Sequence, residues 1–544
     1  MSILPLRGLG TVGVVTDVDP YDLPTSAFSF AKNVRFEDAK IQRGPVFRKV
    51  ANTTAKPKHI LSYLTQSGSP VTLMVADDGA VVEYSSLSGE TDRTPTFTPA
   101  VGEFPVSACV LNNVVYINRP DRVPWFRERE AITSDFAAIP NDATGTVNWP
   151  SNCKAQVLRS MSGVLIAGNI TKGGSSYPTM VKWSNFAINP GTPPDWDYTS
   201  TTSNAGENTL PEMNGSIIDA QSIRDTMFLY STKETWAMEF IGGNDMFRFA
   251  RRFDRGAISD NCVVEEGGVH YVFGQNDLWM HDGTSMKPLA TGKVRRFIYD
   301  TMRRDESAQF FVASNPRLNE VLFCYVSDDK FVKFPATSGK GCNRAVVYNY
   351  TSDTFTFADL PYVTCASQTY LAKGTSITFA NVSGAFNLAG GSFAQIEASS
   401  STNLTFGSDT YGPVTQGLRT YEAYTEVETG FLLDETANGA AYLERTGYDL
   451  DEIKAELRGY KLLSSVYPQG RLNSETQVLT FTIGLNDHPA RTVEWTDPQT
   501  YTLEYYKLDY NVAGRFLSMK VEQNDFAPFT LSGLDLDVSV LGSY

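Results

Sequence analysis

The feature that most constrains this chain is a repeated unit of two short alternating strands joined by a two-residue turn. Aromatic and β-branched residues favour strands, and Asp-Gly, Asn-Asp or Asn-Asn pairs suit turns with positive φ or an Asx hydrogen bond. Antiparallel units that recur every roughly 40–50 residues favour a β-propeller over a row of separate sandwiches. Five or six candidate blades lie at 71–85, 106–120, 155–170, 216–240, 267–289, and 320–326 with 344–361.

The domain organisation follows from length and from one change in composition. A chain of 544 residues is too long for one ordinary core. Near residue 386 the sequence becomes rich in Ser, Thr, Gly and Asn, and alternating segments then resume. We expect an all-β, mainly antiparallel fold with few short helices, divided into N-terminal arm and platform strands (1–54), a β-propeller-like domain (55–385), a polar loop or junction (386–414) and a C-terminal β-rich platform or sandwich domain (415–544).

Three local expectations accompany this division. Residues 1–30 contain few core-forming side chains, so we expect this arm to become ordered against a neighbouring subunit. A short basic helix is predicted after Lys293, with Phe297 and Ile298 on its apolar side. Residues 449–457 predict another short helix.

The chain is acidic, with a formal net charge of −15. From residue 401 to the end, 10 Lys or Arg stand against 21 Asp or Glu, which gives −11. This balance disfavours a protein that grips DNA through its phosphates, but it does not argue against a protein that DNA must slide past. The densest acidic run predicts either an acidic pore lining or a solvated surface: Asp449, Asp451, Glu452 and Glu456.

Catalytic, metal and cofactor signals are weak. The six cysteines form no C-x-x-C pair, so a zinc site is improbable and free thiols in a reducing cytoplasm are expected. His270 and His281 flank one hairpin, and strand-face histidines are the favoured interpretation over a metal pair. We therefore expect no enzyme, no cofactor, no metal and, since no apolar run reaches about 20 residues, no membrane span.

Basic residues gather in the middle of the sequence. They indicate either a contact surface for an acidic partner or phosphate near a channel, or a solvated face paired with local acids such as Asp254, Asp300 and Asp305. The cluster consists of Arg248, Arg251, Arg252, Arg255, Lys293, Arg295 and Arg296.

Four segments follow one another along the chain, at 8–45, 180–196, 232–297 and 514–542. In this order they resemble the tail nozzle of short-tailed bacteriophages, also called tail tubular protein B. The opening has an extended start, a Leu-Pro, the strand Asn-Val-Arg-Phe and then Arg-Gly-Pro. The second segment is similar to the family's blade edge, and the third to its best-marked pair of blades. The closing strands resemble its C-terminal pair.

The resemblance implies a structural virion protein and not an enzyme. It implies a ring of six copies below the tail adaptor and portal, side sites for tail fibres or spikes, and a channel for double-stranded DNA without sequence-specific binding. It also implies a distal constriction that retains the genome, location in the virion tail, and assembly in the host cytoplasm. The alternative is a propeller-type carbohydrate-binding or glycan-degrading tail protein, and a further alternative is a cellular propeller scaffold.

Overall fold

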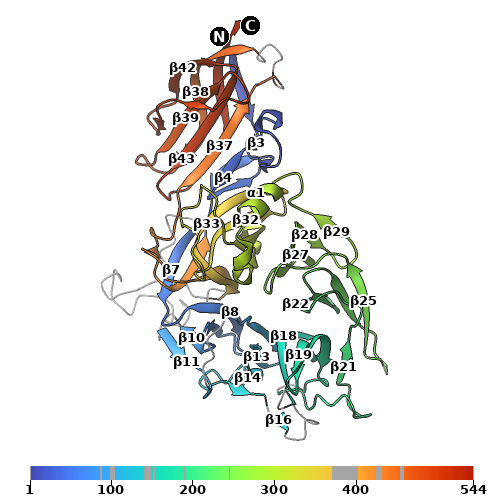
Figure 1. Ribbon diagram of the computed structural model, residues 1–544. Coiled ribbons are helices and arrows are strands. Elements are labelled where there is room, and N and C mark those ends of the chain that lie inside the picture. Colours follow the sequence, from blue (N-terminus) through green and yellow to red (C-terminus); the bar gives the residue numbers. More distant parts are fainter. Residues whose placement is uncertain are drawn as a thin grey trace, which may run out of the picture.

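Antiparallel β-sheets make up most of the computed structural model, which confirms the all-β prediction for the part of the chain that it describes (Figure 1). In this part, α1 (Arg295–Thr301) is the one α-helix, and three short 3-10 turns accompany it at Pro20–Asp22, Arg304–Gln309 and Pro316–Leu318. The structure describes residues 2–85, 89–97, 104–139, 141–142, 149–150, 153–188, 191–243, 245–370, 402–423, 432–451, 453 and 459–542.

Five four-stranded sheets follow one another along the first half of the chain. Within each sheet, consecutive strands pair in chain order, so each sheet is a simple antiparallel meander. They are β8 (Pro57–Leu64), β9 (Pro70–Ala76), β10 (Val81–Ser85), β11 (Gly89–Asp92); β12 (Ser107–Leu111), β13 (Val114–Asn118), β14 (Trp125–Glu128), β15 (Ala137–Ala138); β18 (Cys153–Met161), β19 (Val164–Lys172), β20 (Ser175–Trp183), β21 (Gly206–Thr209); β22 (Asp219–Ile223), β23 (Thr226–Tyr230), β24 (Thr235–Phe240), β25 (Phe247–Phe253); and β26 (Val263–Glu266), β27 (Val269–Phe273), β28 (Leu278–His281), β29 (Met286–Pro288).

Consecutive sheets pack through shared apolar cores. Leu73 of the first sheet and Val115 of the second belong to one cluster of buried side chains. Another cluster joins the second sheet to the third, and Val164 and Leu229 belong to a cluster that joins the third to the fourth. The first strands β12, β18, β22 and β26 contact one another in this order. The sheets therefore lie in a propeller-like arrangement, which Figure 1 shows in its lower half.

A sixth antiparallel set continues this arrangement. It consists of β30 (Phe311–Asn315), β31 (Glu320–Tyr325), β32 (Cys342–Asn349) and β33 (Thr354–Thr369), paired in chain order. β30 contacts β26, and the long strand β33 contacts β8 of the first sheet. Ile60 and Cys365 share a small buried cluster at this last contact. The sixth set thus lies between the fifth sheet and the first.

β33 also belongs to a 16-stranded sheet that extends away from the four-stranded sheets. The strands of this sheet outside the sixth set, together with a six-stranded sheet, form the region that we call the platform, and its strands β37, β38, β39, β42 and β43 lie at the top of Figure 1. Further strands of the large sheet are β2 (Gly13–Val14), β3 (Ala27–Phe28), β4 (Phe30–Lys32), β7 (Val46–Asn52), β34 (Asn403–Ser408), β35 (Gly417–Glu422), β36 (Leu432–Leu433), β37 (Ala441–Tyr448), β39 (Leu479–Asn486), β40 (Glu494–Trp495), β41 (Gln499–Tyr501) and β43 (Phe516–Gln523).

The six-stranded sheet joins the two ends of the chain. β1 (Ser2–Arg7) pairs with β44 (Phe529–Gly542), and Leu4 and Leu6 are buried there. The prediction that the N-terminal arm lacks core residues and becomes ordered only against a neighbour is therefore wrong, because alternate side chains of β1 enter the platform core. The other strands are β5 (Val34–Glu37), β6 (Lys40–Arg43), β38 (Tyr460–Leu472) and β42 (Leu508–Gly514).

The predicted polar loop also needs correction. Within 386–414, residues 386–401 lie outside the described part of the chain. Residues 403–408, however, form β34, which pairs with β33 and β35 and is buried throughout. Leu404 and Phe406 enter the main core, so the Ser- and Thr-rich composition concealed a central strand. Most of the predicted helix at 449–457 also lies outside the described residues.

The predicted turns are confirmed. Asp78-Gly79 joins β9 to β10, Asn112-Asn113 joins β12 to β13, and Ser162-Gly163 joins β18 to β19. Asn112 and Ser162 both have φ of 50°, the left-handed region that these turn pairs accommodate. The basic helix after Lys293 is also confirmed as α1.

Candidate functional site

The basic residues singled out in the sequence lie around the fourth and fifth sheets. Arg248, Arg251 and Arg252 belong to the outer strand β25, and Arg255 follows it. Lys293 precedes α1, whereas Arg295 and Arg296 are the first two residues of that helix. The structure thus brings Arg255 and Arg295 to one pocket and leaves the others on the surrounding surface.

Acidic neighbours pair with most of this cluster. Arg248 and Arg252 both contact Glu239 of β24. Arg251 pairs with the Glu234 carboxylate at 3.0 Å and with Asp254. Exposed pairs of this kind each contribute about 0–1 kcal/mol and leave little net positive field. Lys293 pairs with Asp353 at 3.0 Å.

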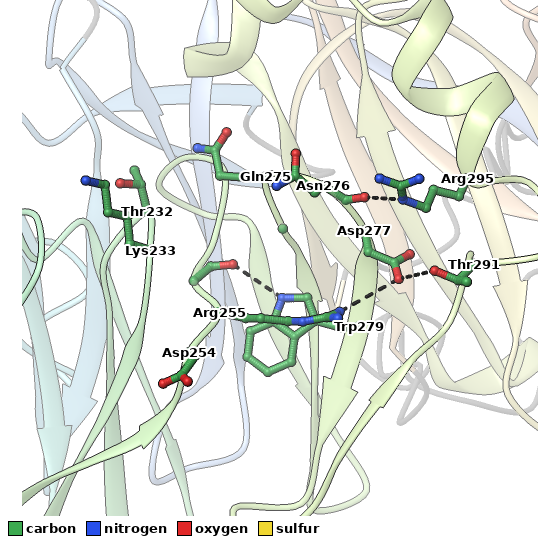
Figure 2. Close-up of a pocket in the computed structure, with 12 residues that line it drawn as sticks. Thr232, Lys233, Asp254, Arg255, Gln275, Asn276, Asp277, Trp279, Thr291 and Arg295 are labelled. Carbon is green, nitrogen blue, oxygen red and sulfur yellow. Dashed lines mark hydrogen bonds and ion pairs between the residues drawn. The ribbon is translucent and has the colours of Figure 1, made fainter.

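The pocket lies between the turn ends of the fourth and fifth sheets and has a volume of about 550 Å³ (Figure 2). Four chain segments line it: the β23–β24 turn, the exit of β25, the β27–β28 turn, and the link between β29 and α1. Their lining residues are Thr232, Lys233, Asp254, Arg255, Gly256, Gly274, Gln275, Asn276, Asp277, Trp279, Thr291 and Arg295.

Two glycines allow these segments to approach one another. A Cβ at Gly256 would lie 1.9 Å from the Ser231 carbonyl oxygen, so only glycine fits where the β25 exit crosses the β23–β24 turn. A Cβ at Gly274 would lie 2.7 Å from the Asp277 carbonyl oxygen. The pocket wall is therefore determined by backbone packing.

Asp277 and Arg255 both line the pocket, and a dashed line joins them in Figure 2. Thr291 Oγ1 donates a hydrogen bond of 2.7 Å to Asp277 Oδ2. Arg255 Nη1 lies 3.8 Å from the same oxygen, which is too long for a hydrogen bond. Asp277 Oδ1 and Arg255 Nη1 are both buried and have no hydrogen-bond partner in the structure. Burial raises the pKa of the Asp277 carboxyl above its ordinary value, although Thr291 and Arg255 act against this.

Two exposed cations complete the pocket. Lys233 comes from the β23–β24 turn and Arg295 from α1, and the Asp277–Arg255 pair lies between them in Figure 2. The Arg295 Nε donates to the Asn276 carbonyl oxygen at 2.5 Å and has no carboxylate within salt-bridge distance among the described residues. Trp279 is only 1% exposed, and its indole donates to the Gly256 carbonyl oxygen. The indole ring therefore supports the wall and offers no free face.

His270 and His281 lie opposite each other across their hairpin, and the hydroxyl of Tyr230 bridges them. The Tyr230 hydroxyl lies 2.6 Å from His270 Nδ1 and 2.6 Å from His281 Nε2. His270 Nε2 faces the Ser222 carbonyl oxygen, so it carries a proton, and Nδ1 must accept from Tyr230. His281 Nδ1 accepts from the Gly283 N–H, so its Nε2 donates to Tyr230.

The hydrogen-bonded chain His270–Tyr230–His281, which we call the relay, is buried. Its hydrogen bonds require both histidines to be neutral. Burial lowers the pKa of His270 to about 4 and that of His281 to about 3. No group of three or more potential metal ligands occurs among the described residues. The pair therefore fastens the fourth sheet to the fifth through Tyr230.

A buried charge network that the sequence analysis missed lies where the sixth set meets the platform. Arg344 is fully buried, and it forms two hydrogen bonds to Asp329, at 2.9 and 2.7 Å, and one to Asp359 at 2.8 Å. Asp359 also accepts from Lys32 and Asn33 next to β4. Burial raises the pKa of Asp359, but Arg344 and Lys32 outweigh burial and hold it below its ordinary value.

The predicted acidic run is described only in part. Asp449 and Asp451 follow β37, and the Asp451 N–H donates to the Asp449 carboxylate. Burial, followed by the contact with Asp451, raises the pKa of Asp449. Glu452 and Glu456 lie outside the described residues, so the position of the run relative to any pore stays a prediction.

All six cysteines are free thiols. Among the described residues, no helix is long and apolar enough to cross a membrane.

The comparisons with known proteins give no identity. No protein-family model matches the chain, and no curated protein is similar to it in sequence. Among solved structures, the crystal structure of the computationally designed Ika8 protein is similar over 70% of this chain and 100% of the designed chain. The sequence identity is 8% and the TM-score is 0.36, so this likeness carries no argument about fold or function.

Proposed function

We propose that this chain is a structural virion protein, the tail nozzle of a short-tailed bacteriophage. In this proposal, six copies form a ring that retains the packaged genome and lets DNA pass during ejection. The support comes from the four sequence segments that resemble this family and from an all-β architecture with a propeller-like half and a second, platform half. The ring joins a tail adaptor and carries fibres or spikes, and it catalyses no reaction.

The propeller in this proposal has six blades. The five four-stranded sheets supply five blades, and β30–β33 supplies the sixth. The contact of β33 with β8, and the buried cluster of Ile60, Met74, Cys365 and Leu418, supports closure between the last blade and the first. Closure would cover the apolar faces of the first and last blades, which would otherwise have no neighbouring blade.

The observation that carries the assembly proposal is a set of exposed apolar side chains on the platform. Ile3 is 62% exposed on β1, and Leu541 is 52% exposed on β44, the strand that pairs with β1. Tyr506 is 72% exposed and contacts Tyr467 of β38 in the same sheet. Apolar and aromatic groups exposed on one sheet are typical of a protein–protein interface.

Particle assembly with surface variants tests this proposal. Leu541→Lys places a charge in the proposed interface, so the yield of infectious particles should fall about tenfold or more. Ile188→Lys is the matched control, because Ile188 is 71% exposed but follows β20, far from the platform sheet in the chain. Equal particle yields from folded forms of both variants would remove the support for this interface.

The proposed channel binds DNA weakly. Phosphate contacts by Lys and Arg would retain DNA through counterion release, whereas a neutral or acidic wall lets it slide. The net charge of −15 supports such a wall. Duplex DNA should therefore show no retention by the purified chain at low salt, and tight retention would contradict this part of the proposal.

A further inference from the structure

The pocket between the fourth and fifth sheets has the polar groups of a ligand site that is independent of ring formation. We propose that it binds a hydroxylated organic anion of monosaccharide size. One hydroxyl of the ligand contacts Asp277 and Arg255, and its acid group faces the cation Lys233.

The need for a hydroxyl follows from the two unpaired atoms. Asp277 Oδ1 is an acceptor and Arg255 Nη1 is a donor, and both are buried without a partner. A buried polar atom without a hydrogen bond costs about 1–3 kcal/mol, more when it is charged. A hydroxyl donates one hydrogen bond and accepts another, so a single hydroxyl can satisfy a carboxylate oxygen and a guanidinium nitrogen together.

The size of the pocket favours a ligand larger than one water. Its volume of about 550 Å³ far exceeds the roughly 30 Å³ that one water occupies in the liquid. It falls within the range of about 300–1,000 Å³ that is typical of small-molecule sites. The glycine-dependent backbone contacts at Gly256 and Gly274 shape the pocket before any ligand arrives, which lowers the entropic cost of binding.

The charges of the lining favour an anion. Lys233, Arg255 and Arg295 face two carboxylates, and one of these, Asp254, pairs with Arg251 outside the pocket. Lys233 and Arg295 have no carboxylate partner among the described residues. Since Trp279 offers no free ring face, recognition rests on charge and hydrogen bonds, and a flat apolar ligand gains little here.

Two sources share this chemistry, a uronic acid and a sugar phosphate. Ligand-detected NMR on the full chain distinguishes them with glucuronate, glucose 6-phosphate, inorganic phosphate and neutral glucose, each up to about 10 mM. We expect one of the two sugar acids to bind more tightly than glucose and more tightly than inorganic phosphate. Absence of binding by both sugar acids would overturn the proposal. Equal binding of glucose 6-phosphate and inorganic phosphate would overturn the role of the hydroxyl.

Substitutions locate the binding in this pocket. Asp277→Asn should weaken the sugar acid about tenfold or more, because it removes a charge-assisted hydrogen bond. Lys233→Ala should weaken it about twofold to fivefold and leave neutral glucose unchanged. Lys154→Ala removes the same charge from an exposed position on β18 and should have no effect.

Unchanged affinity in Lys233→Ala and in Asp277→Asn would show that the sugar acid binds elsewhere. Lys233 is exposed, so the Lys233→Ala measurement still tests the proposal even if Asp277→Asn does not fold. Ring assembly is unaffected by either result, so failure of this proposal and failure of the nozzle proposal are distinguishable.

Discussion

The four-stranded sheets and the platform are stabilised in different ways. Neighbouring four-stranded sheets in the first half of the chain share apolar cores, and each sheet forms from one continuous stretch of 26 to 57 residues. The platform also shares an apolar core with the sixth set, but it combines both chain ends in one sheet and adds buried charges at Arg344, Asp329 and Asp359. Removal of one member of a buried charge network leaves its partners buried without their counter-charge, which is strongly destabilising.

The largest loss of stability is expected when a substitution breaks the buried charge network. Arg344→Met leaves Asp329 and Asp359 buried without their main partner, which should cost about 3–5 kcal/mol of unfolding free energy. Hydrogen–deuterium exchange should rise in peptides that cover β4, β32 and β33 and stay unchanged in β18–β21. Exposed Arg248→Met is the control. Equal exchange in Arg344→Met and the wild type would refute the contrast between the two regions.

The second prediction is that the protein loses stability as the pH falls, because two buried histidines must stay neutral. Folded His270 and His281 have pKa values of about 4 and about 3, below the ordinary value of 6.5, so the unfolded chain binds protons more readily. The stability that the neutral relay provides is complete above about pH 6.5 and is lost as pH falls toward 4. Each histidine accounts for up to about 1.4 kcal/mol per pH unit.

Denaturant midpoints at pH 7 and pH 5 measure this loss. His270→Gln should reduce the pH dependence, whereas His488→Gln, at an exposed position, should leave it unchanged. An unchanged pH dependence in folded His270→Gln would show that the relay does not carry the acid sensitivity.

A smaller effect is expected from the hydroxyl of the relay. Tyr230→Phe leaves His270 Nδ1 and the His281 Nε2–H without their partner, which should cost about 1–3 kcal/mol. The loss should appear as faster exchange at the contact of the fourth and fifth sheets. A loss below about 0.5 kcal/mol would mean that water replaces the hydroxyl.

The smallest effect is expected at the pocket rim. Lys233→Ala should change stability by less than about 0.5 kcal/mol, because the side chain is exposed and belongs to no buried network. Thermal melts of this variant and of Lys154→Ala should coincide. A clear loss in Lys233→Ala alone would mean that this cation supports the fold, and it would weaken its assignment to a ligand.

The sequence predicted the local features of the fold and few of the nonlocal ones. Turn pairs such as Asn112-Asn113 and the amphipathic helix α1 depend on neighbouring residues, so their patterns are visible in one segment. The pairing of β1 with β44 joins residues more than 500 positions apart, and no local signal identifies such a partner. β34 has a polar composition, which favours a loop. The alternation of Leu404 and Phe406 with polar residues is the one local pattern that indicates a strand there.

The candidate site was predicted only in part. Arg255 and Arg295 were singled out because basic residues cluster in the sequence. Asp277 lies in an Asn-Asp turn of the predicted 267–289 unit, but its burial and its unpaired oxygen arise from nonlocal packing around that turn, which no local pattern shows. Two sequence features could have indicated this pocket. One is Gly274 followed by Asn276-Asp277, and the other is the Arg255-Gly256 pair, since each places a glycine next to charged or polar residues.

Electron microscopy of particles that carry this protein tests the central claim most directly. With the chain labelled at Ile188 in the four-stranded-sheet region, averaged tail images should show six labels around one axis below the portal. The platform should lie toward the adaptor, with a channel wide enough for duplex DNA. A label that is absent from the tail, or present there in a non-ring arrangement, would contradict the account.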